Sequence, residues 1–172
     1  MTVSPIRPSP EPSSLDIERW AASSGSERTS RANLTIVGGG HRWRANADGN
    51  GAIDALLRAV DSALTALLGE GVILTSFEVH AKGGGHEAQA DVSVGVQRRD
   101  QPEAPVYAGG AIDENLLQAS VVAYIDAVNA LLAAEGIDVA SAVPSPGETQ
   151  THETDPDHKS SSKDDIMSAY NS

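Results

Sequence analysis

The chain contains no cysteine among its 172 residues. This absence excludes disulfide bonds, thiolate nucleophiles and cysteine-ligated zinc sites. Aromatic residues make up only 3% of the sequence, whereas hydrophobic residues together make up 40%. A core must therefore be assembled from Ala, Val, Leu and Ile in thin layers, which suits helices packed on a sheet.

Basic residues are also scarce, since 12 Lys and Arg stand against 24 Asp and Glu, for a formal charge of −12. Binding to nucleic acid or to an anionic membrane depends mainly on clustered Lys and Arg, so neither is an expected partner. No run approaches the ~18 consecutive apolar residues of a membrane span, and the N-terminus lacks an apolar stretch of signal-peptide length. We therefore expect a cytoplasmic protein.

Two polar segments flank the part of the chain that can fold. Residues 1–30 mix Pro, Ser and charged residues, and residues 136–172 form an acidic tail rich in Ser and Pro. Such compositions bury too little apolar surface to offset the entropy of ordering, so both segments are expected to be disordered. The single folded domain is expected to span residues 31–135.

The expected domain begins with a hairpin and a helix. Residues 32–37 and 41–46 carry strand patterns, and the three glycines between them tolerate the positive φ of a tight turn. Apolar residues then recur at helical spacing over residues 53–68, and Gly69 and Gly71 are expected to end this helix.

The second half repeats this order. Residues 75–81 and 88–96 alternate around the glycines at 83–85, which predicts two half-buried antiparallel strands. A short strand is expected around Val106, followed by a helix capped by Asp113 or Asn115.

The predicted fold class is thus α+β, with two pseudo-symmetric repeats of two or three strands and a helix, and antiparallel sheets packed on two helices. Each repeat alone leaves one sheet face and one helix stripe uncovered. Packing the two repeats together, or two subunits, would close the core, so a homodimer is expected.

Several motifs resemble the C-terminal regulatory domain of 2-isopropylmalate synthase over about residues 31–133. They are the turn Gly49, Asn50 and Gly51 before the first helix, the strand start Ala88, Gln89 and Ala90, and the series Gly109, Ala119, Ser120, Ala127 and Asn129 in and before the second helix. The sequence departs from the family pattern at Ala111, where a G-x-G turn has its second glycine, and at Asn115, where Asp is common.

The resemblance implies a non-catalytic domain that dimerises and binds leucine at the dimer interface as a feedback inhibitor of a distant catalytic barrel. That barrel needs about 250 residues and a divalent metal, for which this sequence has no room, so we expect no enzymatic activity, no cofactor and no metal site. The expected effector is leucine or a related branched-chain carboxylate. A separate synthase is the expected partner in regulation.

The candidate effector site combines small and apolar side chains with backbone N–H groups. Inward-facing strand positions and the start of the first helix could outline a cavity for a branched aliphatic side chain. The N–H groups after Gly49 and near Ile112 could hold its carboxylate. The alternative is that the small residues only permit close packing of the layers. The candidate residues are Gly49, Gly51, Ile53, Phe77, Ala81, Ala88, Ala90, Gly109 and Ile112.

Two further features have alternative interpretations. His80 and His86 could meet as metal ligands across the turn at 83–85, but both fall on the polar side of the alternation, where solvated residues are expected. Near the C-terminus, Ile166, Met167 and Tyr170 recur at helical spacing. A second functional interpretation is therefore a repurposed scaffold, in which the folded domain is a recognition handle and the tail is docked to, or modified by, a partner enzyme.

Overall fold

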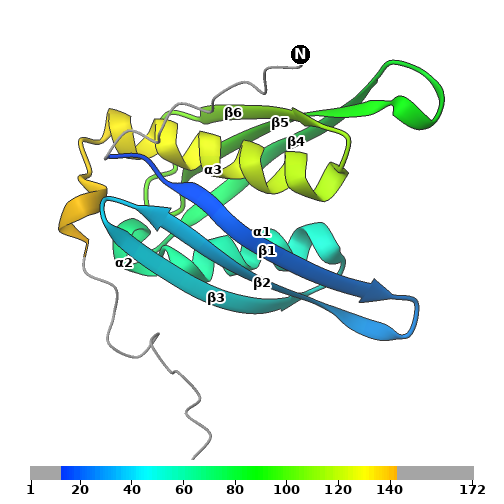
Figure 1. Cartoon of the computed structure of the whole chain (residues 1–172). Helices are drawn as coiled ribbons and strands as arrows, with labels where there is room; N and C mark the ends of the chain where they lie inside the picture. The colour runs from blue at the N-terminus through cyan, green and yellow to red at the C-terminus, as the bar shows by residue number, and fades with distance from the viewer. Residues whose placement is uncertain (1–12, 143–172) are drawn as a thin grey trace, which may run out of the picture.

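The computed structural model describes residues 13–142 and shows two similar halves, each with a three-stranded antiparallel sheet followed by a helix (Figure 1). The first half comprises β1 (Asp16–Gly25), β2 (Arg28–Gly38), β3 (His41–Gly49), α1 (Ala52–Ala63) and α2 (Thr65–Leu68). The second half comprises β4 (Val72–Lys82), the short η1 (Gly85–Glu87), β5 (Gln89–Arg98), β6 (Tyr107–Asp113) and α3 (Leu116–Ala134), and η2 (Val139–Ser141) follows it. The predicted α+β class with two strand-and-helix repeats is confirmed.

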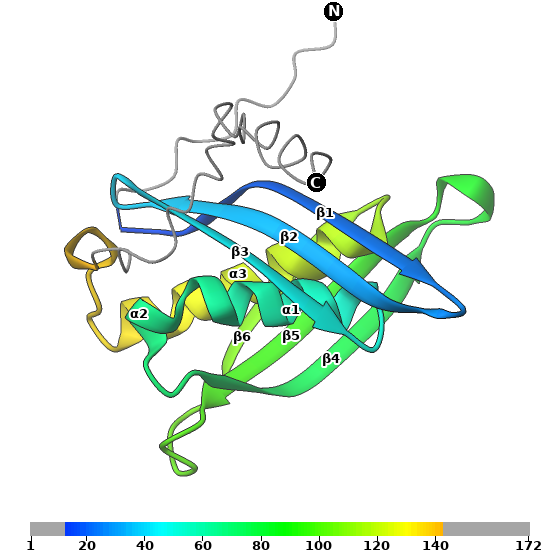
Figure 2. The ribbon, with the colours of Figure 1, turned by 90° about the horizontal axis from the view of Figure 1, so that it is seen from below.

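The helices form a layer between the two sheets (Figures 1 and 2). Helix α1 packs on β2 and β3, α3 packs on β5 and β6, and the two helices also contact each other. The buried side chains form one cluster of mostly Ala, Val, Leu and Ile, with Trp43 and Tyr124 as its aromatic members. A single core therefore closes both repeats.

Helix α3 is long and apolar enough, by composition, to cross a membrane. In the fold it contacts β1 of the first sheet as well as β5 and β6 of the second. A helix that is apolar all round needs such cover on several sides, and the two sheets supply it. The apolar character of α3 is thus explained by its place in the core.

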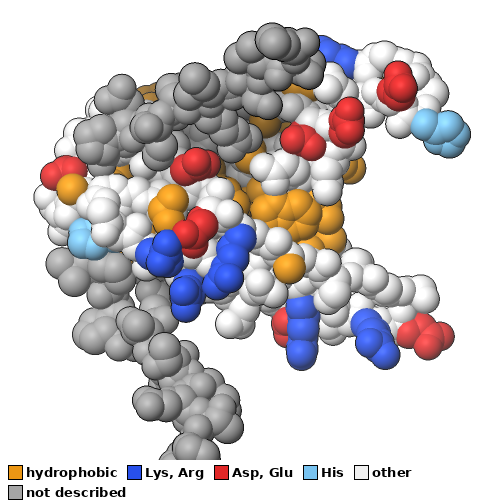
Figure 3. All heavy atoms as spheres, in the orientation of Figure 1, with side chains coloured by type: hydrophobic (Ala, Val, Ile, Leu, Met, Phe, Trp, Pro, Cys, Tyr) orange, Lys and Arg blue, Asp and Glu red, His pale blue; other side chains and the backbone are white. Residues whose placement is uncertain are grey.

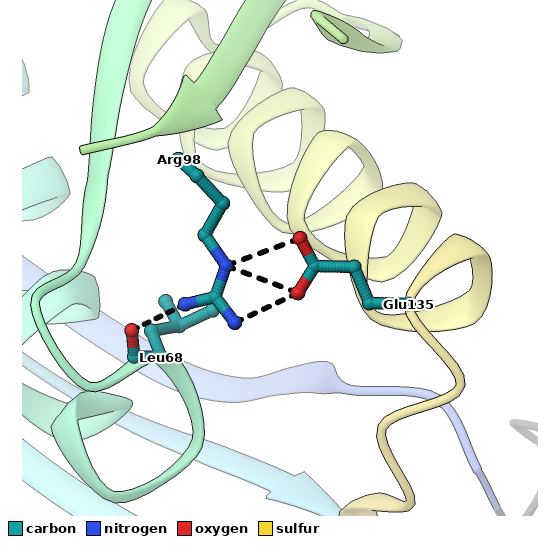
Figure 4. A network of polar contacts seen from close by, with 3 residues as sticks. All are labelled: Leu68, Arg98 and Glu135. Carbon is teal, nitrogen blue, oxygen red and sulfur yellow. Dashed lines mark hydrogen bonds and ion pairs between the residues drawn. The ribbon is translucent and has the colours of Figure 1, made fainter. Parts of the chain in front are cut away.

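A polar network ties the two repeats together where α2 and α3 end (Figure 4). Arg98 on β5 donates from Nη1 to the carbonyl of Leu68 at 2.5 Å and from Nη2 to Oε2 of Glu135 at 2.7 Å. Leu68 is the last residue of α2, and Glu135 is the C-cap of α3. The network therefore joins the end of the first repeat to a strand and a helix of the second.

The glycine turns lie where the sequence predicts them. Gly39 and Gly40, with φ of +55° and +81°, connect β2 to β3, and Gly69, with φ of +57°, ends α2. In the β4–β5 turn, Gly83 and Gly85 also have positive φ. These backbone conformations favour glycine because a Cβ would be strained there.

Strand β1 overturns the expectation that residues 1–30 are disordered. It pairs antiparallel with β2, and Trp20 lies opposite Leu34. The strand has few apolar residues, and an irregularity in the register between Ile17 and Arg19 breaks their alternation. The local pattern therefore hides a strand that pairing with β2 stabilises.

Residues 136–142 also belong to the fold, which corrects the expected start of the tail at 136. Val139 is fully buried, and Nε2 of His41 lies 2.9 Å from the carbonyl oxygen of Ala140. A Cβ at Gly39 would lie 2.5 Å from the nitrogen of Ala140, so the glycine turn also makes room for this segment.

The folded part thus extends beyond the expected 31–135 at both ends. The disorder expected of residues 1–12 and 143–172, and the spacing of Ile166, Met167 and Tyr170, lie outside the described residues.

Candidate functional site

Both main helices begin at the end of the molecule from which two hairpins project (Figures 1 and 2). We call this region the hairpin end. It is formed by the turns at 25–28 and 83–88 and by the first turns of α1 and α3. Hydrophobic side chains gather in a hollow between the two sheets at this end (Figure 3). An apolar hollow beside two helix N-termini is a suitable place for a small carboxylate with an aliphatic side chain.

Three of the predicted residues lie together on the helix-facing side of the second sheet. Ala81 is directly opposite Ala90, and Phe77 is opposite the buried Val94. Directly opposite residues share a face of a sheet, so all three point to the same side. Phe77 and Ala90 are half-buried and Ala81 is exposed. They therefore form an apolar strip along β4 and β5 that α3 covers only in part.

Three other predicted residues lie where β3 leads into α1. Gly51 is the N-cap of α1 and makes no side-chain cap, and Ile53 is half-buried against the core. A Cβ at Gly49 would lie 2.5 Å from the nitrogen of Ala55, so this glycine permits close contact between β3 and the helix. The first turn of α1 thus presents N–H groups that no side chain of the N-cap satisfies.

Asp54 occupies part of the cradle that we expected for an effector carboxylate. The N–H of Asn50 donates to Oδ2 of Asp54 at 2.9 Å, and Nε of Arg58 donates to the same oxygen at 2.9 Å. The hydrogen bond from Asn50, and secondarily Arg58, lowers the pKa of Asp54 below its usual value. An ionised carboxylate is therefore already present beside the start of α1.

The start of α3 is capped by the side chain of Asn115. Its Oδ1 accepts hydrogen bonds from the N–H of Leu117 at 2.9 Å and of Gln118 at 3.4 Å. Asn is as good an N-cap as Asp, so the departure from the family pattern at 115 keeps the cap. These N–H groups are already used, and a ligand carboxylate would have to displace the cap to reach them.

Two of the predicted residues, Gly109 and Ile112, do not belong to the apolar strip. A Cβ at Gly109 would lie 2.2 Å from the nitrogen of Ala127, so the missing side chain allows α3 to pack on β6. Ile112 lies opposite Asp91, on the other face of the sheet from Phe77, and is 50% exposed. The packing alternative therefore accounts for Gly109, and Ile112 faces away from the strip.

The expected G-x-G turn is wrong as a turn. Gly109, Gly110 and Ala111 belong to β6 and pair with β5. The backbone at Ala111 does not have a positive φ, so a Cβ is tolerated there without strain. The remaining candidate, Ala88, is the C-cap of η1, directly before β5.

The hairpin end also contains residues that the sequence reasoning missed. Nε1 of Trp20 on β1 donates a hydrogen bond to Oε1 of Gln118 in the first turn of α3. Leu116, at the start of the same helix, is 39% exposed. Trp20 lies in a segment whose composition predicts disorder, and no local pattern identifies it, because the register irregularity between Ile17 and Arg19 breaks the alternation of Ile17, Trp20 and Ala22.

A second hollow lies on the outer face of the first sheet and contains none of the predicted residues. This groove of about 600 Å³ is lined by Ala21, Ala22, Ser23, Arg31, Ala32, Asn33, Asn46, Ala47 and Asp48. Nε of Arg31 lies 3.1 Å from Oδ1 of Asp48, and both side chains are exposed. The groove suits small polar molecules, and it has no large apolar side chain to bind an aliphatic one.

Within residues 13–142, no three His, Asp or Glu side chains lie together as a metal site would require. Nε2 of His80 lies 3.6 Å from Oε2 of Glu78, and both side chains are exposed on the strand surface. The pair fits a solvated surface contact.

Comparison with known proteins agrees with this architecture. Residues 6–132 match the family model described as the LeuA allosteric (dimerisation) domain. A 2-isopropylmalate synthase from Aromatoleum aromaticum is 32% identical over 126 residues, which cover 73% of this chain and 23% of that protein. A 2-isopropylmalate synthase from Methylorubrum populi is 37% identical over 110 residues, which cover 64% of this chain and 20% of that protein. A probable 2-isopropylmalate synthase from Archaeoglobus fulgidus is 33% identical over 122 residues, which cover 71% of this chain and 23% of that protein.

The chain thus spans between a fifth and a quarter of the length of these relatives. The matched residues include β1, which lies outside the domain expected from the sequence, and both strand-and-helix repeats. The chain belongs to the LeuA allosteric (dimerisation) domain family.

Proposed function

We propose that this chain is a non-catalytic, cytoplasmic module that forms a homodimer, binds leucine or a related branched-chain carboxylate at the hairpin end, and regulates a synthase on a separate chain. The observation that carries this proposal is the apolar strip of Phe77, Ala81 and Ala90, on two strands whose hairpin projects from the end of the molecule where both helices begin (Figure 1). Membership of an allosteric and dimerisation family supports the same role.

The strip suits an aliphatic side chain. The small side chains of Ala81 and Ala90 leave space beside the ring of Phe77, and the strip is only partly buried by the fold. Burying each CH₂ contributes ~0.8 kcal/mol, so a four-carbon side chain contributes about 3 kcal/mol. One methylene changes binding by about 1 kcal/mol or more, so leucine is expected to bind several-fold tighter than valine.

The start of α1 offers complementary groups for the polar end of an amino acid. The first N–H groups of the helix favour a carboxylate, and the ionised side chain of Asp54 favours an ammonium group. Asp54 is already held in place by Asn50 and Arg58. In the proposed site both ends of a zwitterion are therefore recognised, and a fatty acid of the same shape binds more weakly.

Calorimetry tests the binding. We expect a saturable signal with leucine, a weaker one with valine, and a further loss with 4-methylpentanoate, which lacks the ammonium group. Phe77→Ala is expected to weaken leucine binding about tenfold through lost apolar contact. Ile112→Ala is the matched control, because Ile112 is an exposed apolar residue on the opposite face of the same sheet. Silence with leucine at millimolar concentration would reject the site.

A second measurement tests the regulation. The activity of a 2-isopropylmalate synthase from the same organism is measured with and without this protein, at several leucine concentrations. We expect leucine to change activity more when the protein is present, and Phe77→Ala to remove that difference. Equal leucine dependence with and without the protein would contradict regulation in trans, whatever the calorimetry shows.

A further inference from the structure

Strand β4 is largely exposed to solvent, although its sequence contains several large apolar residues. Of its eleven residues, only Val72 is buried, although β4 lies in a sheet with a packed helix. On the helix-facing side, Leu74 is 41% exposed and Val79 is 43% exposed. The strand is also an edge of its sheet, where β5 is its neighbour on one side (Figure 2). A long apolar edge strand with free backbone groups is a template for pairing with another strand.

On the other edge strands of the described fold, a helix covers the apolar face or the register is irregular. Helix α1 packs on β3, and α3 packs on β6. Strand β1 has two irregularities in its register, between Ile17 and Arg19 and between Ser23 and Gly25. Such bulges twist an edge and oppose further pairing. Among these four edges, β4 is the one that combines a free edge with exposed large apolar side chains on its helix-facing side.

The regular part of β4 is short and has a definite centre. A bulge lies between Leu74 and Ser76, and Gly83, with φ of +86°, ends the extended backbone after Lys82. The stretch available for regular pairing is therefore residues 76–82. Its middle residue is Val79.

We propose that β4 pairs antiparallel with β4 of a second copy of this chain, across a two-fold axis at Val79, so that the two sheets become one of six strands. The proposal rests on the proposed homodimer and specifies its surface. In this register Val79 faces the partner's Val79, and Phe77 faces the partner's Ala81 on the same apolar side. Cross-strand apolar pairs of this kind stabilise a sheet.

The polar face of β4 is complementary to itself in the same register. Glu78 lies opposite the partner's His80, and Ser76 lies opposite the partner's Lys82. Moving the axis to Glu78 would place this carboxylate opposite the partner's Glu78, which is destabilising. Moving it to His80 would place Glu78 opposite the partner's Lys82, but it would shorten the regular pairing to residues 78–82, because Gly83 ends the extended backbone. The length of the regular stretch and the charges together therefore favour the axis at Val79.

The charge of the whole chain adds a second reason for this surface. Each copy carries a formal charge of −12, which opposes association wherever acidic residues meet. Strand β4 carries Glu78 and Lys82, so its formal charge is balanced with His80 neutral. Nζ of Lys82 lies 2.8 Å from Oδ2 of Asp91 on the neighbouring strand. This ion pair holds the ammonium group at the end of the stretch that pairs. Two copies therefore meet at β4 with little repulsion.

Single cysteines test the register directly, because the natural chain has none. Val79→Cys is expected to form an intermolecular disulfide on mild oxidation, since directly opposite Cβ atoms in a sheet lie about 5 Å apart. Leu74→Cys is the matched control: it is equally exposed, lies on the same face of the same strand, and falls outside the pairing stretch. We expect it to remain largely uncrosslinked.

Charge exchange tests the complementarity without cysteines. Glu78→Lys replaces the carboxylate opposite the partner's His80 with an ammonium group, and His80→Glu places a second carboxylate opposite the partner's Glu78. Each variant alone is expected to self-associate roughly tenfold more weakly by sedimentation equilibrium. Mixing the two variants brings the introduced lysine of one copy opposite the introduced glutamate of the other, so we expect the mixture to recover association. Equal weakness of the mixture and the single variants would count against the register.

The outcomes distinguish a failure of β4 pairing from a failure of the proposed homodimer. A wild-type protein that is dimeric, with Val79→Cys no more crosslinked than Leu74→Cys, overturns pairing through β4 and leaves the dimer in place on another surface. A wild-type protein that is monomeric at all concentrations tested overturns both. Leucine binding is measured separately and is decided by neither result.

Discussion

The side-chain amide of Asn129 on α3 binds the backbone of Leu15 through both of its polar atoms. Oδ1 accepts a hydrogen bond from the N–H of Leu15 at 2.8 Å, and Nδ2 donates to the carbonyl of Leu15 at 2.9 Å. The amide thus pairs with the chain much as a neighbouring strand would. Because the two residues are 114 positions apart, this contact fixes the start of β1 to α3 and joins the two repeats.

Replacing Asn129 with Ala is expected to destabilise the protein and to loosen β1. Both backbone groups of Leu15 lose their partner in a partly buried site, which costs about 1–3 kcal/mol. Urea denaturation measures the loss, and hydrogen exchange at Leu15 and in β1 should accelerate more than in β5. Asn33→Ala is the control, since Asn33 is an exposed amide for which a change within about 0.5 kcal/mol is expected. An equal effect of the two substitutions would show that the paired hydrogen bonds contribute little.

Adjacent glycines on β6 give a test of helix packing. A Cβ at Gly109 would lie 2.2 Å from the nitrogen of Ala127 and 2.3 Å from the carbonyl oxygen of Ala123, so α3 must move. Gly109→Ala is expected to cost about 1–3 kcal/mol in the free energy of unfolding. At Gly110 the nearest atom is 3.5 Å away, so Gly110→Ala is expected to be near neutral. If Gly109→Ala left stability unchanged and abolished leucine binding, Gly109 would serve a ligand and not packing.

These contacts explain which parts of the fold could be predicted from sequence. The β2–β3 turn, both long helices and the cap at Asn115 follow from local patterns, because glycine conformation, helical spacing and capping act over a few residues. Strand β1 could not be found in this way, since its stability comes from pairing with β2 and from the distant Asn129.

The residues of the candidate site also divide into those that a local pattern places and those whose position depends on tertiary structure. Alternation correctly placed Phe77, Ala81 and Ala90 on one face, because the two-residue period of a strand is local. It could not show that Ile112 faces the other way, since that depends on how β6 is registered against β5. Gly109 could not be assigned to packing without the position of α3, which is a tertiary property.

The network around Arg98 gives a further prediction, about the junction between the repeats. The side chains of Arg98 and Glu135 are only 13% and 23% exposed, so the ion pair is largely removed from solvent. Glu135→Ala leaves a poorly solvated guanidinium with the Leu68 carbonyl as its remaining partner, and a loss of up to about 3 kcal/mol in stability is expected. Arg58→Ala is the control, because its pair with Asp54 is exposed and should contribute below about 1 kcal/mol. Thermal unfolding of the two variants compares them, and similar shifts would contradict a special role for the network.

Asp61 on α1 and Tyr124 on α3 predict how stability depends on pH. The hydroxyl of Tyr124 donates to Oδ1 of Asp61 at 2.6 Å inside the helix layer. Burial is the main cause that raises the pKa of Asp61 above its usual 3.8, and the hydrogen bond from Tyr124 and the positive charges of Arg99 and Arg58 offset this only in part. Burial and the neighbouring carboxylate also raise the pKa of Tyr124, so its hydroxyl keeps the proton that it donates.

Folded Asp61 therefore holds its proton to a higher pH than the unfolded chain does. Its contribution to stability is fully present below the unfolded pKa of 3.8 and is lost as the pH rises through the folded pKa. Asp61→Asn removes this titration and keeps an acceptor for the Tyr124 hydroxyl. We expect the variant to gain stability relative to the natural protein as the pH rises from about 4 to 7, measured by urea denaturation across that range. Tyr124→Phe should do the opposite and lose most stability at pH 7, because it leaves an ionised buried carboxylate without its donor. A constant difference between Asp61→Asn and the natural protein at every pH would show that Asp61 titrates alike in the folded and unfolded chains.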